Sequence, residues 1–206
     1  MKKITVLLVV VCAFVSSFAQ PTGKGQIDWG ISFGAGLNLL NSSGSGSDKY
    51  FMMTVLPGAY VMYGLNDYFA VSLNPQYSPW YLNDFDFNGF MHYVDIPAFI
   101  GYHGERATVD IGVQYSQYIS NSVGFYKTDK LNYFSGVIQI GFNASDLWSI
   151  LGDNSVQIFR FSLGLNKISF YPYENSGKGE FRPIMFEVVY RYNISDNVPS
   201  SSRRRR

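Results

Sequence analysis

The sequence contains very little cysteine and unusually little charge. Its only cysteine is Cys12, which lies in an N-terminal segment that should be removed, so the mature chain has neither a disulfide nor a thiolate metal site. Charged residues make up 15% of the chain, against about 25% in an ordinary soluble domain. Lys and Arg number 16 and Asp and Glu 15, and this near-neutral balance argues against a nucleic-acid partner.

Long apolar runs are also missing beyond the N-terminal segment. No later stretch supplies the roughly 18 consecutive apolar residues that a membrane-spanning helix needs. Aromatic residues are nevertheless abundant, at 17% of the chain. Few charges and many aromatics are typical of a β-barrel that presents an apolar band and aromatic girdles to lipid.

The N-terminal segment has the layout of a secretory signal. Lys2 and Lys3 precede a short apolar core at residues 4–15, and Ala19 precedes a plausible cleavage site at Gln20. We therefore predict a signal peptide at residues 1–19, a barrel domain at residues 20–192 and a disordered basic tail at residues 193–206 that ends in four arginines. Removal of the signal from the 206-residue chain leaves 187 residues, which suits one domain.

The main structural signal is strict alternation in residues 27–39. Every second residue is apolar, and the residues between them are small or polar: Asp28, Gly30, Ser32, Gly34, Gly36 and Asn38. A period of two predicts a β-strand with one apolar and one polar face. Because the pattern returns about eight times, we predict an all-β fold, an eight-stranded antiparallel transmembrane barrel of the outer-membrane type. The expected strands are residues 27–39, 50–63, 69–77, 93–102, 107–119, 133–142, 157–166 and 183–192.

The connections between these strands alternate between short turns and long loops, except that residues 143–155 form a long connection on the short-turn side. Residues 65–67 and 104–105 are tight turns, whereas residues 41–49, 78–90, 120–130 and 167–180 form longer loops. In outer-membrane barrels the long loops lie outside the cell, which predicts that both chain ends are periplasmic. A two-residue turn at 104–105 also predicts that Asp95 lies opposite Gln114 and Phe99 opposite Asp110.

Four segments resemble a known family. They are HYVDIPAFIGY in the fourth expected strand, LNPQYSPWY, FSLGLNKI and the closing FEVVYRY. Together they are similar to the PorT-like family, small outer-membrane β-barrel proteins of the Bacteroidetes, over about residues 29–192. The resemblance implies an eight-stranded barrel. The name-giving members are tied to type IX secretion, so it also implies a place in an envelope or secretion assembly.

Six charged residues have the parity of the polar face and should point into the barrel: Asp28, Asp95, Asp110, Arg160, Glu187 and Arg191. They would form either a conduit with a charged lining or a plug of paired charges. An eight-stranded barrel is only just wide enough for its own side chains to fill it, which favours the plug. Buried charges must also be paired, because an unpaired charge is very costly.

Catalytic and metal chemistry has little support in the sequence. The two histidines are His92, near the outer rim, and His103, near the opposite turn. A catalytic nucleophile needs a base that a third group orients, and no such group is evident at either position. Two histidines a strand-length apart also make no metal site, so we predict no cofactor and no enzyme activity.

The loop expected at residues 78–90 is the strongest candidate for a binding surface. It contains Trp80, Tyr81, Asp84, Phe85, Asp86 and Phe87, in which aromatic and acidic residues alternate. One interpretation is a surface for an envelope protein, a glycan or lipopolysaccharide. The other is the aromatic girdle that such barrels carry at the lipid boundary.

The functional prediction is a non-enzymatic outer-membrane barrel that acts as a scaffold or interaction module. Its expected partners are outer-membrane lipid, lipopolysaccharide and an envelope protein. Two other classes remain open at this point, namely a barrel that passes ions or small solutes and a lipid-modifying enzyme.

Overall fold

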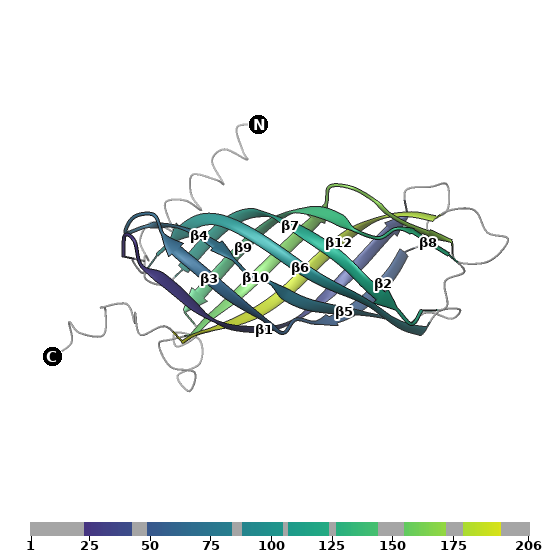
Figure 1. Cartoon of the computed structure of the whole chain (residues 1–206), viewed down its shortest axis with the longest axis horizontal. Helices are drawn as coiled ribbons and strands as arrows, with labels where there is room; N and C mark the ends of the chain where they lie inside the picture. Colours follow the sequence, from purple (N-terminus) through teal and green to yellow (C-terminus); the bar gives the residue numbers. More distant parts are fainter. Residues whose placement is uncertain are drawn as a thin grey trace, which may run out of the picture.

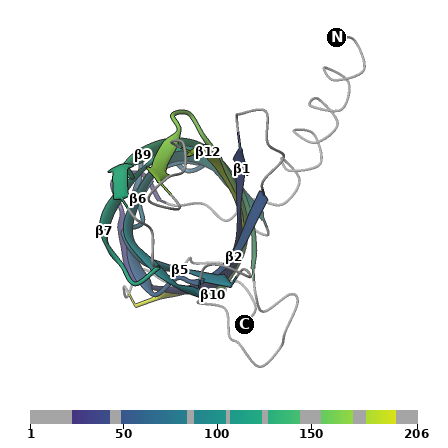
Figure 2. The ribbon, with the colours of Figure 1, turned by 90° about the vertical axis from the view of Figure 1, so that its right-hand side faces the viewer.

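The chain folds into a closed antiparallel β-barrel. The computed structural model describes residues 23–42, 49–83, 88–104, 107–123, 127–143, 155–171 and 179–194. The barrel closes because β1 (Ile27–Ser42) pairs with β12 (Gly179–Asn193) over 13 residue pairs. Figure 1 shows the strands tilted around a long axis, and Figure 2 shows the ring that they form when seen from one end. Among the described residues, no helix is long and apolar enough to cross a membrane.

Twelve strands occur in the part of the chain that the structure describes. Ten form the wall, and two short ones, β8 (Lys127–Lys130) and β11 (Ile168–Tyr171), extend from one end of it. We call this end the loop end; it is on the right in Figure 1, and the opposite end is the turn end. The other strands are β2 (Lys49–Val55), β3 (Gly58–Gly64), β4 (Phe69–Leu73), β5 (Gln76–Asn83), β6 (Asn88–His103), β7 (Ala107–Asn121), β9 (Tyr133–Asn143) and β10 (Ser155–Gly164).

The prediction of eight strands is not matched, because prolines divide two of them. Both β2 and β3 pair with β1, and both β4 and β5 pair with β6. The divisions fall at Pro57 and Pro75, which have no backbone N–H to donate to the ladder. The backbone N–H of Ala59 donates to the Pro75 carbonyl and that of Tyr77 to the Pro57 carbonyl, at 3.0 and 2.9 Å, so the wall stays joined across both divisions.

The predicted alternation decides which side chains face outward. In β1, Ile31 and Phe33 are 56% and 61% exposed, whereas Ser32 and Asn38 between and beyond them are buried. The same pattern runs around the barrel and leaves an outer surface rich in Leu, Ile, Val and Phe. A closed sheet with an apolar outside is one of the two structures that satisfy every backbone group in lipid.

The pairing of β6 with β7 differs from the predicted register by two residues. Asp95 lies opposite Ser116 instead of Gln114, and Gly101 lies opposite Asp110. Pairing continues through His103–Thr108, and the backbone N–H of Gly104 donates to the Ala107 carbonyl at 2.9 Å, so the connection lies one residue further along the chain than the predicted turn at 104–105. A slip of two keeps every side chain on its own face, and alternation alone therefore cannot detect it.

Candidate functional site

All six charged residues that were predicted to line the lumen lie inside the barrel. Each is at most 6% exposed: Asp28, Asp95, Asp110, Arg160, Glu187 and Arg191. They come from β1, β6, β7, β10 and β12, whose inward positions bring distant parts of the sequence together. The structure divides them into three groups, centred on Arg160, Arg191 and Asp95.

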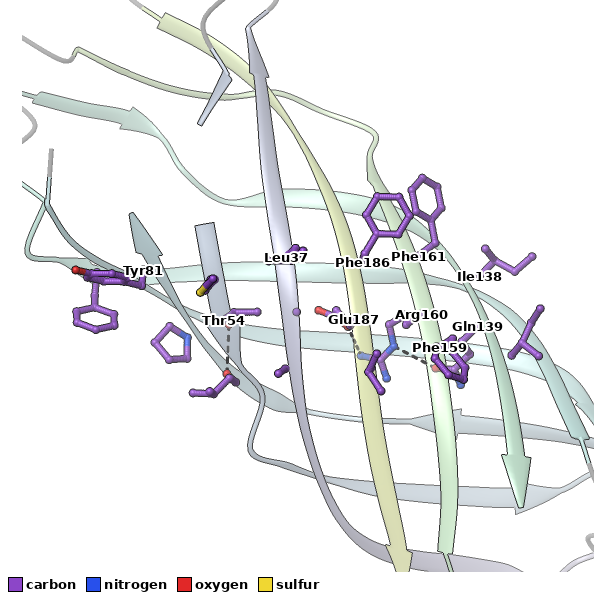
Figure 3. A pocket seen from close by; sticks show the side chains of 18 residues that line it. Leu37, Thr54, Tyr81, Ile138, Gln139, Phe159, Arg160, Phe161, Phe186 and Glu187 are labelled. Atoms are coloured by element: carbon purple, nitrogen blue, oxygen red, sulfur yellow. Dashed lines mark hydrogen bonds and ion pairs between the residues drawn. The ribbon is translucent and has the colours of Figure 1, made fainter. Parts of the chain in front are cut away.

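Arg160 is the centre of the largest group. Its Nη1 donates to Glu187 Oε2 at 3.0 Å and to Gln76 Oε1 at 2.9 Å, and its Nε donates to Gln139 Oε1 at 3.1 Å. These partners come from β12, β5 and β9, so one guanidinium ties three strands together from inside. Figure 3 shows Arg160 between Glu187 and Gln139, with dashed lines that mark the two interactions.

The network continues from Gln139 toward the turn end. The side-chain Nε2 of Gln139 donates to Asp110 Oδ2 at 2.6 Å, and Asp110 Oδ1 lies 2.8 Å from His103 Nε2. Both His103 and Asp110 are buried. His103 was not among the residues predicted to line the lumen, although it has the same parity as Asp95 on the same strand, and that parity was the signal that could have placed it there.

Arg191 forms a second group near the turn end. Its Nε donates to Asn74 Oδ1 at 3.0 Å, and its guanidinium carbon lies 5.2 Å from the ring centroid of Tyr60. Asn74 in turn donates through Nδ2 to Ser32 Oγ at 3.2 Å. Asn74 precedes Pro75 at the division between β4 and β5, so the strand break also places an inward amide beside Arg191.

Asp95 is fully buried near the middle of the lumen. Neither carboxylate oxygen has a hydrogen-bond partner among the described residues, and the hydroxyls of Ser78 and Ser116 lie near it but outside hydrogen-bond geometry. Glu187 and Arg160 are its charged neighbours. The pairing that joins Arg160 to Glu187 therefore does not extend to Asp95.

The loop end of the lumen is filled by apolar and aromatic side chains, which we call the plug. Its buried members are Leu40, Met52, Trp80, Leu82, Met91, Tyr93, Val123, Leu131, Tyr133, Ile168, Phe170, Phe181 and Met185. Trp80 stacks on Tyr93 with ring centroids 4.4 Å apart, and the Tyr133 ring lies 5.7 Å from Trp80. The plug of paired charges that the sequence predicts is a different feature; this apolar plug was not predicted, and it interrupts the polar character expected of the lumen.

The placement of Trp80 in an outer loop is wrong. Trp80 lies in β5, is completely buried, and donates from Nε1 to Ser78 Oγ at 3.0 Å. The alternation continues past Pro79, which faces outward and pairs with His92, so the strand runs on to Asn83. Trp80 consequently shares the inward face with Ser78, where the lumen supplies apolar neighbours for the indole.

The other members of the predicted interaction loop divide into two groups. Tyr81 lies on the outer wall near the loop end, and its ring packs against Phe90 of β6 with centroids 4.9 Å apart. Asp84, Phe85, Asp86 and Phe87 lie outside the described residues. Below Tyr81, the ring of His92 stacks near Phe90 and accepts or donates a hydrogen bond with the Tyr77 hydroxyl.

The outer wall over β1, β2, β10 and β12 forms a shallow apolar groove. Leu37, Phe159 and Phe186 project into it from neighbouring strands, while the Arg160 group lies on the lumen side of the same strands (Figure 3). The wall is thus one sheet thick between an apolar exterior and a charged interior. Among the described residues, no three His, Cys, Asp or Glu side chains gather into a possible metal site.

Comparisons with known proteins agree with this architecture. No family model matches the sequence, and no curated protein matches it. Solved structures similar to the chain include Neisserial surface protein A, at 12% identity with a TM-score of 0.50, covering 80% of this chain and 96% of that one. Outer membrane protein AlkL is similar at 14% identity with a TM-score of 0.51, covering 87% and 95%. At these identities the likeness shows the fold, which is that of a small outer-membrane β-barrel.

Proposed function

We propose that this chain is a bacterial outer-membrane barrel that acts as a non-enzymatic scaffold or interaction module. In this proposal the loop end faces the outside of the cell and both chain ends face the periplasm. The PorT-like kinship that the sequence motifs imply, with its envelope or secretion assembly, is part of the same proposal.

The observation that carries the proposal is the filled lumen. Trp80, Tyr93, Tyr133 and Phe170 are among the largest fully buried side chains, and all lie in the plug at the loop end. Below them Arg160 spans the interior from β10 to partners on β5 and β12. Interiors packed in this way leave little room for a solute, so the surfaces available for function are those outside the barrel.

The surface around Tyr81 and Phe90 is the best supported partner site. Phe90 is 42% exposed, and both residues flank the connection that contains the alternating aromatics and acids. Aromatic side chains anchor protein interfaces, while flanking charges set the orientation of the partner. This combination favours an envelope protein as the partner.

Co-purification from outer membranes provides the test. Tyr81 and Phe90 are replaced together by Ser, and proteins retained by the variant are compared by mass spectrometry with those retained by the wild type. The control replaces Tyr68 and Tyr102, an aromatic pair at the turn end whose ring centroids lie 6.0 Å apart. Both variants should keep the heat-modifiable mobility of a folded barrel, and only the first should lose a partner. Retention of every partner by the first variant contradicts the proposal.

A further inference from the structure

The loop-end rim of β7, β9 and β10 has a network of outward amide groups. The Gln117 Nε2 donates to Asn132 Oδ1 at 3.3 Å and the Tyr115 hydroxyl donates to Gln117 Oε1 at 2.6 Å. Asn166 Nδ2 donates to the Asn132 carbonyl at 3.3 Å. The Tyr115 ring also packs against Phe134. Amides and rings are therefore fixed side by side across three strands at the boundary of the apolar belt.

Basic side chains lie beside this network. Ile168 pairs with Phe181, so the adjoining Lys167 and Arg182 lie at the same end of the β11–β12 pairing, and both are exposed. Lys130 is also exposed, and it lies opposite Ser169 in the pairing of β8 with β11. Two acids lie near these cations. Glu180 forms an ion pair with Lys167 at 3.1 Å, and the exposed Asp129 directly precedes Lys130. The three cations outnumber these two acids.

The surface immediately below the rim is strongly apolar. Phe134 on β9 and Leu165, which directly follows β10, are 53% and 62% exposed. Phe186, nearer the middle of β12, is 58% exposed. A ligand that lies across this boundary would meet acyl-compatible side chains first, then amides and rings, and then cations. The order of these contacts is that of an amphiphile with a phosphorylated, hydroxyl-rich headgroup.

The turn-end rim differs in composition. It also carries stacked aromatics, since Tyr68 lies 6.0 Å from Tyr102. Its exposed charges in the described part of the chain are Lys24 and Asp67, one of each sign. Aromatic girdles occur at both boundaries of such barrels, so the aromatics alone do not distinguish the rims. The amide network and the excess of cations do.

We propose that the loop-end rim over β7, β9, β10 and β12 binds the phosphorylated saccharide headgroup of an outer-leaflet glycolipid. Lys167 and Arg182 pair with its phosphate, since charge-assisted hydrogen bonds to phosphate are among the strongest that side chains form. The exposed faces of Tyr115 and Phe134 contact the sugar, and the acyl chains lie against Leu165 and Phe186. The inference rests on the proposed orientation, in which the loop end faces the outer leaflet.

The test measures glycolipid binding to the folded barrel in phospholipid nanodiscs by native mass spectrometry. The ligands are a bisphosphorylated lipid A, its dephosphorylated form, phosphatidylglycerol and inorganic phosphate. The variant carries Lys167→Gln and Arg182→Gln, and the control carries Lys24→Gln at the turn end. Each basic residue near an anionic surface contributes a fewfold to binding, so the double variant should bind lipid A about tenfold to thirtyfold more weakly. The control should bind as the wild type does.

The ligand series separates the sources of any binding. Lipid A should bind better than its dephosphorylated form and better than phosphatidylglycerol, and inorganic phosphate should not compete at millimolar concentration. Equal binding by the wild type and the double variant, or equal binding of lipid A and phosphatidylglycerol, overturns the glycolipid site. A protein that fails to enter bilayers as a heat-modifiable barrel would instead contradict the proposed function, so the two failures are distinguishable.

Discussion

The lumen contains two regions that are filled by different physical means. At the loop end, the plug around Trp80 and Met185 is apolar and aromatic. From the middle to the turn end, the interior is held by hydrogen bonds and ion pairs that centre on Arg160 and Asp110. The plug is stabilised by close packing, to which each buried group adds a modest amount. The polar region depends on pairing around Arg160 and Asp110, because removal of one partner leaves the other charge buried and unpaired.

The first way to test this comparison is to remove Arg160. Arg160→Met leaves Glu187 buried without its cation, and we expect the free energy of unfolding to fall by about 3–5 kcal/mol. Urea unfolding of the refolded barrel, followed by tryptophan fluorescence, measures the change. Arg160→Met combined with Glu187→Leu removes both charges and should recover much of the loss. A single variant that is as stable as the wild type would show that the pair is not required.

The plug should respond to truncation in proportion to volume. Met185→Ala removes a completely buried side chain whose sulfur also accepts a hydrogen bond from the Tyr133 hydroxyl at 3.5 Å. We expect a loss of about 2–4 kcal/mol in the same unfolding experiment, because the cavity is only partly refilled. Met185→Leu keeps the volume and should cost about 1 kcal/mol or less. Equal losses for both substitutions would indicate that packing does not stabilise this region.

Removal of His103 should lower the free energy of unfolding by less than the loss of Arg160 or Met185 does, but by more than a change on the outer surface. His103→Leu leaves the buried Asp110 with Gln139 as its remaining hydrogen-bond partner, and we expect a loss of about 1–3 kcal/mol. His92→Leu, on the outer wall, should change stability by about 0.5 kcal/mol or less. If the two histidine variants unfold alike, the position of His103 inside the polar region has no energetic consequence.

The smallest effect is expected outside both regions. Lys167 and Glu180 form an exposed ion pair, with side chains that are 41% and 47% accessible. Glu180→Gln should lower the free energy of unfolding by about 0–1 kcal/mol, and the loss should shrink further in high salt. A loss comparable to that of Arg160→Met would erase the distinction between the buried network and the surface.

Alternation in the sequence predicted the side on which each residue lies but not how the strands meet. The inward positions of Asp95 and Arg160 followed directly from parity. The register of β6 and β7 did not, because a slip of two residues leaves parity unchanged. The division of two strands at Pro57 and Pro75 also leaves parity unchanged, and its signal in the sequence was the prolines themselves, which cannot donate to the ladder.

The plug and the His103–Asp110 pair show a different limit. The inward positions of Trp80 and His103 could have been predicted by extending the alternation of the third expected strand past Tyr77 and that of the fourth as far as residue 103. What the sequence could not show is which inward residues meet across the barrel. Arg160 reaches Gln76, which lies 84 positions away in the chain, and only closure of the barrel brings them together.

The filled lumen is the central claim, and ion conductance tests it most directly. Purified protein is inserted into planar bilayers, and current is recorded for the wild type and for Trp80→Ala, which removes the largest side chain of the plug. The wild type should show no steady conductance, because the plug closes the loop end and the Arg160 network fills the middle. A stable open state of the wild-type protein would contradict this account and favour a barrel that passes ions or small solutes.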